Sequence, residues 1–233
     1  MNPTKKTATI MGVYFLAAYV LGISGIVLSR LFDPSFTALQ NLLTAVSENS
    51  IRIKFSIFCD LFATVSVVGL TTTLFITLKD QNKQMAWLGL GCWLLYASVG
   101  LASRIHVFSL LQLSQEYSGK AAQEADYFFT LGHLTVGAAN SGYLILSFFF
   151  RMGGLAFYYL FFTSRLVPRF LSVWGLLAMV LGMGSFFLEF FNYYPGNLDT
   201  ILSIPNVLFE PFIGIWLIVK GFNTPGKAET SRK

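Results

Sequence analysis

One apolar segment constrains the fold more than any other part of the chain: residues 141–162 read SGYLILSFFFRMGGLAFYYLFF. A helix of about 20 predominantly apolar residues is long enough to cross the hydrocarbon core of a bilayer. This segment has that length, but it carries Arg151 near its middle. A charge at bilayer depth costs about 2.5–3.5 kcal/mol on insertion scales, so it must face a partner, a water-filled cavity or a protein interior. The rest of the chain has to supply that setting.

The composition of the whole chain is that of a membrane protein. Of its 233 residues, 55% are hydrophobic and only 12% are charged, compared with about 25% charged residues in an average soluble domain. A water-soluble fold of this size would not hide so much apolar surface, so the bilayer is the expected solvent. At about 20 residues per helical span, the chain has room for six or seven crossings.

The net charge of +5 does not indicate a nucleic-acid partner, because no basic run is interleaved with aromatic residues. The basic residues instead lie at the ends of apolar segments, as the positive-inside rule of membrane topology predicts. Cys59 and Cys92 both lie within apolar segments, where cysteine acts as a small hydrophobic residue. The expected partner is therefore the lipid bilayer, and neither a disulfide nor a metal-binding cysteine pair is predicted.

The apolar segments predict one transmembrane domain over residues 1–222, followed by a polar tail over 223–233. The first apolar run exceeds the roughly 7–15 residues usual in a cleaved signal peptide and lacks a clear A-x-A site, which favours an uncleaved span. In the polar loop that follows, apolar residues at helical spacing predict an interfacial helix over 36–47. The six spans are expected at about residues 10–29, 55–78, 85–111, 140–163, 170–191 and 201–219.

The apolar sequence from Tyr127 to Phe162 is too long for one crossing, since a helix rises about 1.5 Å per residue. The run GAANSG at residues 137–142 is predicted to divide it. In that case an interfacial or re-entrant helix occupies residues 127–139, and the fourth span begins at about residue 140. A continuous helix that is tilted or kinked is the alternative.

Basic residues predict the orientation of the six spans. With the N-terminus inside, the outer loops hold Arg30, Arg52, Lys54 and Lys120. The inner segments hold Lys5, Lys6, Lys79, Lys83, Arg165, Arg169, Lys220, Lys227, Arg232 and Lys233. This asymmetry predicts that both termini are cytoplasmic. The first outer loop, with Arg30, Arg52 and Lys54, is more basic than the rule prefers.

Six ionisable side chains lie inside or beside the predicted spans, and the predicted topology places all of them in the outer half of the membrane. They are Asp60, Arg104, His106, Arg151, Glu189 and Glu210. Because charges at that depth need partners, one interpretation is a charge-paired network that fixes the helix register. The other is an outward-facing cavity that binds a polar or anionic ligand or relays protons, since intramembrane ionisable residues are candidates for function.

The chemistry of these residues suggests more specific arrangements. Glu189 and Glu210 lie on consecutive spans joined by a short loop, so they are expected to come close, and a close carboxylate pair can hold one proton. Pro211 frees a backbone carbonyl one turn earlier and can kink the helix beside Glu210. His106, Asp60 and a glutamate are zinc-ligand types, but the chain has no H-E-x-x-H, no histidine cluster and no CxxC, so no metal or cofactor is predicted. The serines lie in no G-x-S-x-G context, which argues against a serine nucleophile.

Three stretches of the chain read KKTATIMGVYFLAAYVLGISG, SRLVPRFLSVWGLLAMVLGMG and PNVLFEPFIGIWLIVKGFN. Together they resemble the DUF4386 family of bacterial and archaeal membrane proteins, most specifically at the junction 166–172 and in the last helix, 210–221. Ser172 stands where glycine is more usual in that family, and Phe209 where a small residue is expected. The resemblance implies about six spans and a bacterial or archaeal cytoplasmic membrane, and it draws attention to Glu210 as a candidate functional residue. It supplies no established activity.

The sequence thus predicts an all-α polytopic bundle with six spans and both termini cytoplasmic. The leading functional hypothesis is the binding or transport of a small polar or anionic ligand through a charged, outward-facing cavity. The alternatives are a membrane-embedded enzyme acting on a lipid or small molecule, and a regulatory, immunity or assembly protein whose charges are structural. A wet cavity between the charges would favour the first two, and direct pairing of every charge would favour the last.

Overall fold

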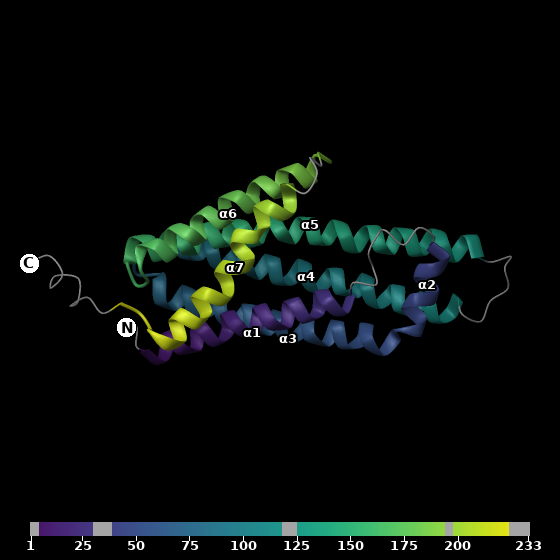
Figure 1. The fold of residues 1–233 in the computed structure, drawn as a ribbon, viewed down its shortest axis with the longest axis horizontal. Coiled ribbons are helices and arrows are strands. Elements are labelled where there is room, and N and C mark those ends of the chain that lie inside the picture. Colours follow the sequence, from purple (N-terminus) through teal and green to yellow (C-terminus); the bar gives the residue numbers. More distant parts are fainter. Residues whose placement is uncertain (1–4, 30–38, 118–124, 194–197, 224–233) are drawn as a thin grey trace, which may run out of the picture.

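The computed structural model describes residues 5–29, 39–117, 125–193 and 198–223, which form seven α-helices and no β-strand (Figure 1). Six of these helices are long and apolar enough to cross a membrane. The predicted all-α bundle with six spans is therefore confirmed, whereas the cytoplasmic position of both termini stays a prediction. The helices are α1 (Lys5–Ser29), α2 (Leu39–Glu48), α3 (Ser50–Leu78), α4 (Lys83–Tyr117), α5 (Ala125–Ser164), α6 (Arg169–Phe190) and α7 (Leu198–Val219).

The six long helices form a closed ring in which each contacts the next, in the order α1, α3, α4, α5, α6 and α7, with α7 returning to α1. They run in alternating directions, so the start of α1, the end of α7 and the α5–α6 junction lie at one end of the bundle (Figure 1). Asn223, which follows α7, is hydrogen-bonded to the α5–α6 junction at this end. Its backbone N–H donates to the carbonyl of Leu166 (2.8 Å), and its side-chain amide donates to the carbonyl of Arg165 (3.0 Å). We call the half of the ring at this end the terminal half.

The ring closes where α1 meets α7. Gly12 of α1 faces Gly214 of α7, and a Cβ atom on Gly12 would lie only 2.5 Å from the carbonyl oxygen of Gly214. Without side chains at these positions the two backbones approach closely, as small residues permit between membrane helices. The first and last spans of the chain are therefore direct neighbours.

An aromatic core fills the terminal half. Phe157, Tyr158 and Phe161 of α5 are fully buried, and the ring of Tyr158 lies 4.9 Å from that of Phe209 on α7. Trp93 of α4 packs edge-on against Phe157 at 5.2 Å. Apolar residues from α1, α3 and α6 complete the cluster. Close packing of this kind is a main source of cohesion between membrane helices, because lipid tails are as apolar as the side chains.

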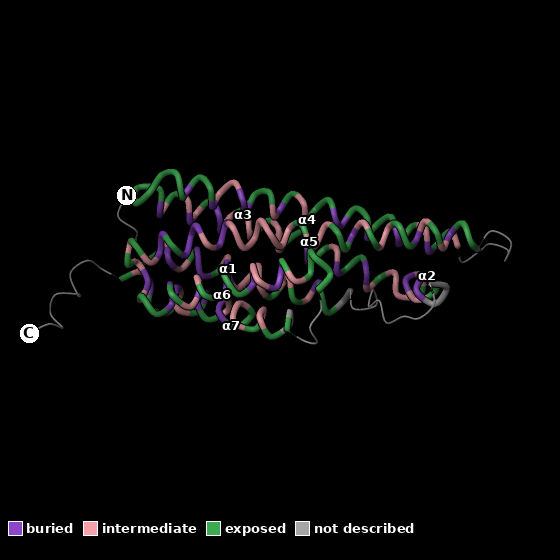
Figure 2. The backbone as a smooth tube through the Cα atoms, turned by 90° about the horizontal axis from the view of Figure 1, so that it is seen from above, coloured by how far each residue is buried: buried purple, intermediate pink, exposed green. Residues whose placement is uncertain are grey.

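Beyond the ring, α4 and α5 continue past the ends of α6 and α7 (Figures 1 and 2). The 40 residues of α5 extend about 60 Å, roughly twice the hydrocarbon thickness of a bilayer. Helix α2 packs on this extension, and its Leu42, Leu43 and Val46 are buried there in a second apolar cluster with residues of α3, α4 and α5. The apolar residues that predict a helix over 36–47 thus form a face that is buried against other helices. Residues 36–38 lie outside the described part of the chain.

Helix α5 corrects one expectation from the sequence. The division expected within residues 137–142 is absent, because residues 125–164 form one helix. A glycine inside a helix costs only about 1 kcal/mol relative to alanine, and packing along α4 offsets that cost. Ala139 is buried in the second apolar cluster, and Gly142 lies directly against the side chain of Ser103 on α4.

Candidate functional site

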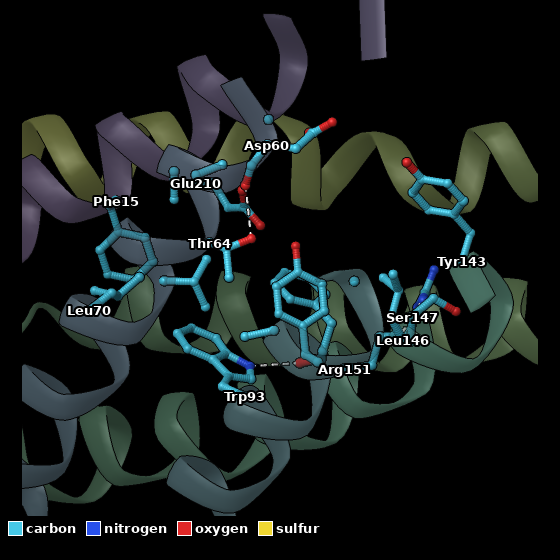
Figure 3. A pocket seen from close by; sticks show the side chains of 18 of the residues that line it. Phe15, Asp60, Thr64, Leu70, Trp93, Tyr143, Leu146, Ser147, Arg151 and Glu210 are labelled. Carbon is cyan, nitrogen blue, oxygen red and sulfur yellow. Dashed lines mark hydrogen bonds between the residues drawn. The ribbon is translucent and has the colours of Figure 1, made fainter. Parts of the chain in front are cut away.

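A cavity of about 320 Å³ lies inside the ring, between α1, α3, α4, α5 and α7 (Figure 3). We call the half of the ring that contains it the cavity half. Phe15, Leu70 and Trp93 belong both to the lining of the cavity and to the apolar core of the terminal half. They gather on one side of the cavity in Figure 3. The cavity therefore begins where the close-packed core ends.

Asp60 and Arg104 form an ion pair at the cavity. The Nε atom of Arg104 lies 2.9 Å from Oδ2 of Asp60, and the two side chains are only 10% and 12% exposed. The two groups carry opposite charges, so the contact is a salt bridge. The guanidinium also lies 4.9 Å from the centre of the Tyr143 ring, within cation–π range. These two opposite charges therefore compensate each other inside the bundle.

Neighbouring residues hold Asp60 in place. Gly25 of α1 packs on its carboxylate, and a Cβ atom on Gly25 would collide with it. One turn before Asp60, the hydroxyl of Ser56 donates to the carbonyl of Gly25 (2.9 Å). One turn after it, the hydroxyl of Thr64 donates to the carbonyl of Asp60 (2.8 Å), the bond dashed in Figure 3. The carboxylate of Asp60 therefore lies at the close contact between α1 and α3.

Arg151 and Glu210 line the same cavity without such a pair. The Nη1 atom of Arg151 donates to the carbonyl of Ser147 one turn earlier on α5 (2.8 Å). The Oε1 atom of Glu210 accepts from Nδ2 of Asn206 one turn earlier on α7 (3.0 Å). Among the described residues, the ion pair on Asp60 is the one salt bridge found. One guanidinium and one carboxylate therefore line the cavity without a salt bridge to another described residue.

Asn206 adds an unsatisfied polar group to the cavity. Its amide nitrogen donates to Glu210, whereas its buried Oδ1 atom has no hydrogen-bond partner. Leaving a buried acceptor unpaired costs about 1–3 kcal/mol, so this oxygen is an attachment point for a donor group. Together Arg151, Glu210 and Asn206 offer N–H donors, a carboxylate and a carbonyl oxygen to a bound molecule.

A second cavity of about 270 Å³ lies toward the extension formed by α4 and α5. His106 and Asn140 are among its lining residues, and it shares Arg104 and Tyr143 with the first cavity. The stacked side chains of Arg104 and Tyr143 therefore form a partition between the two cavities.

The structure brings four of the six predicted ionisable residues to the first cavity: Asp60, Arg104, Arg151 and Glu210. His106 is exposed and lines the second cavity. Glu189 is exposed on α6, within electrostatic reach of Arg151 but outside the cavity lining, so the expected pair of Glu189 and Glu210 is not part of this site. In the described ranges, no group of three or more His, Cys, Asp and Glu side chains is placed to hold a metal ion.

Sequence reasoning missed the neutral polar side chains of the cavity. Asn206 lies four residues before Glu210, so the two share a helix face. Tyr143, Ser147 and Arg151 recur at the same interval of four and form one stripe along α5. A polar residue one turn from a charge within an otherwise apolar helix is the signal that would have found them.

Comparison with families of known sequences matches residues 10–221 to the family described as "Domain of unknown function (DUF4386)". The match runs from the first turns of α1 to the end of α7, nearly the whole chain. No curated protein and no solved structure matches this chain.

Proposed function

This chain belongs to the DUF4386 family, and from the geometry of its cavity we propose that it is a multi-pass membrane protein that binds a small zwitterionic ligand and carries it across the membrane. The proposal keeps the anionic group expected from the sequence and adds a cationic group to the ligand. It follows from the two charges that line the cavity without a salt bridge.

One observation carries the proposal. Arg151 and Glu210 line the same cavity, and neither forms a salt bridge with another described residue, whereas Asp60 and Arg104 pair with each other. Both residues are partly buried, and a purely structural network would pair such charges directly, as it does Asp60 and Arg104. A ligand with one anionic and one cationic group complements the two remaining charges.

Each group of such a ligand has a partner of suitable chemistry. A guanidinium presents a planar set of N–H donors that matches a carboxylate or phosphate, so Arg151 is the partner of the anionic group. An ammonium group has three N–H donors. It can bind Glu210 together with the unsatisfied Oδ1 atom of Asn206.

The size and lining of the cavity support a small organic ligand. A volume of 320 Å³ is near the lower end of the range of about 300–1,000 Å³ for ligand pockets. The side formed by Phe15, Leu70 and Trp93 accommodates a hydrocarbon portion, while the charged residues bind the ends. An amino acid or a zwitterion of similar size fits these requirements.

Three compounds of matched size test the binding step: β-alanine carries both charges, propionate only the carboxylate and propylamine only the ammonium group. The zwitterion should bind the full-length protein in neutral detergent about tenfold more tightly than either analogue, measured by calorimetry and thermal unfolding. In the Arg151→Gln variant, β-alanine should bind no more tightly than propylamine. In the Glu210→Gln variant, β-alanine should bind no more tightly than propionate. Equal affinities of the wild type for all three compounds would contradict the proposal.

Transport requires a route to the cavity, and the second cavity beyond Arg104 and Tyr143 supports such a route. Proteoliposomes that exchange labelled β-alanine for unlabelled β-alanine would test this step separately. Binding with no exchange above that of protein-free liposomes would reject transport.

A further inference from the structure

A groove of about 720 Å³ runs between α1 and α3 and shares no residue with the cavity inside the ring. Its α3 side is a row of three phenylalanines, Phe55, Phe58 and Phe62, which are 60%, 53% and 51% exposed. Successive rings in the row contact each other, with centroids 6.2 Å and 4.7 Å apart. Ile23 and Val27 lie on its α1 side. A hollow with these apolar walls fits a hydrocarbon chain.

Two basic residues stand at one end of this groove, in the first turns of α3. Lys54 is exposed and lies one turn before Phe58 on the same helix face. Arg52 is half-buried, and its Nη2 atom donates to the carbonyl of Val27 at the edge of the groove (3.2 Å). A guanidinium has five N–H donors, so further donors remain for a ligand.

The protein does not neutralise this positive end in the ranges that the structure describes. Glu48, four residues before Arg52, is exposed and forms no salt bridge with it, and Asp60 is paired with Arg104. Arg52 and Lys54 also belong to the segment predicted as the first outer loop, which holds more basic residues than the positive-inside rule prefers for that side. An anionic group bound at this end accounts for both observations.

We propose that the groove binds an anionic phospholipid, with one acyl chain along the row of phenylalanines and the headgroup phosphate on Arg52 and Lys54. Basic sites beside membrane helices recognise anionic headgroups by this chemistry. A zwitterionic phospholipid would fill the groove but leave the net positive charge uncompensated. A free phosphate ion would meet the charges but gain nothing from the apolar walls. The proposal is independent of the ligand of the inner cavity.

Lipid selectivity of the full-length protein tests this proposal. The protein in neutral detergent is titrated with phosphatidylglycerol or phosphatidylcholine of identical acyl chains, and bound lipid is counted by native mass spectrometry. Phosphatidylglycerol should bind about tenfold more tightly because of its charge-assisted contacts. The double variant Arg52→Gln/Lys54→Gln should reduce this preference to about twofold or less, whereas Arg52→Lys/Lys54→Arg should keep most of it.

A matched control removes two charges at the other end of α3. Lys79→Gln/Lys83→Gln changes exposed lysines beside the α3–α4 junction and should leave the lipid preference intact. Short-chain phosphatidylglycerol should compete only weakly, and inorganic phosphate should not compete, because neither fills the groove. Equal binding of the two lipids by the wild type, or the same loss of preference in both glutamine variants, would overturn the proposal.

Discussion

The terminal half and the cavity half of the ring differ in what fills the space between the helices. In the terminal half, side chains such as Phe157 and Phe209 are fully buried in a continuous apolar core. In the cavity half, the helices enclose about 320 Å³ lined by two residues of each charge. The close-packed core and the charge-lined cavity are therefore separate features of one bundle. One half is filled by apolar side chains, and the other keeps an open, charged space.

Trp93 joins the two halves. Its ring packs on Phe157 in the core and stacks on Phe150 at 5.9 Å. Its Nε1–H donates to the carbonyl of Phe150 (2.9 Å), so the one polar atom of the indole is satisfied. Trp93 also lines the cavity, and it therefore presents an apolar wall there. Trp93 thus belongs to the apolar core of the terminal half and also forms a wall of the cavity in the cavity half.

Removing a core side chain tests the packed half and should have the largest effect. Phe157→Ala should lower the free energy of unfolding by about 3–5 kcal/mol, because Phe157 is fully buried and its loss leaves a hole beside Trp93. Unfolding by SDS in mixed micelles measures this change. Ile105→Ala, at a position that is 66% exposed on α4, is the control and should cost less than about 0.5 kcal/mol. Equal costs would refute the distinction between core and surface.

Breaking the ion pair tests the charged half. Arg104→Gln should lower the free energy of unfolding by about 1–3 kcal/mol, because Asp60 loses its partner but the neighbouring cavity can supply water. The same SDS titration measures it. Asp60→Asn combined with Arg104→Gln should recover most of the loss, since no unpaired charge remains. If the two single losses simply add in the double variant, the pair is not coupled and the interpretation fails.

A methyl group added to α1 tests the close contact that closes the ring. Gly12→Ala should cost about 1 kcal/mol or slightly more, because its Cβ atom would meet the backbone oxygen of Gly214, which cannot move aside without separating α1 from α7. Thermal unfolding in detergent measures the cost. Gly91→Ala on α4 meets nothing within 4 Å, so it should be neutral or slightly stabilising. A Gly12→Ala protein as stable as wild type would argue against the close α1–α7 contact.

The same change ten residues later should have the smallest effect on stability. Gly22 lines the cavity, and a Cβ atom there meets nothing within 4 Å. Gly22→Ala should therefore change the free energy of unfolding by less than about 0.5 kcal/mol. It should nevertheless weaken the binding of β-alanine several-fold, because the methyl group occupies space in the cavity. Calorimetry on Gly22→Ala and Gly91→Ala compares a methyl inside the cavity with one outside it, and equal affinities would mean that the ligand does not reach Gly22.

The length of each apolar run was enough to predict the six long helices, because a span in lipid must satisfy its own backbone hydrogen bonds. The order of the helices around the ring was beyond such reasoning. Each span is apolar on nearly all sides, so hydrophobic periodicity does not reveal which face meets which neighbour. The Gly12–Gly214 contact that closes the ring depends on local shape, and GAANSG at 137–142 signals a break that packing on α4 overrides.

The sequence predicts how far along its helix each residue of the candidate site lies, but not which helix face carries it. Counting residues from the helix ends brought Asp60, Arg151 and Glu210 to a common level, and all three line the cavity. Successive residues are also rotated by about 100° around the helix axis. Counting residues from the helix ends does not take this rotation into account. His106 follows Arg104 by two residues and so lies on another side of α4, where it is exposed. The face of each helix that turns inward is decided by its neighbours.

Closure of the ring between Gly12 and Gly214 has to wait until α7 has been made. Within the ring, α1 comes before the other helices in the chain and α7 comes after them, so the partner of Gly12 is made only after the other five helices of the ring. A nascent chain of five spans has an open seam along α1 and lacks the wall that carries Glu210. The bare Gly12 position of α1 therefore stays uncovered until α7 inserts, and insertion of α7 closes the ring and supplies the cavity wall with Glu210 in the same step.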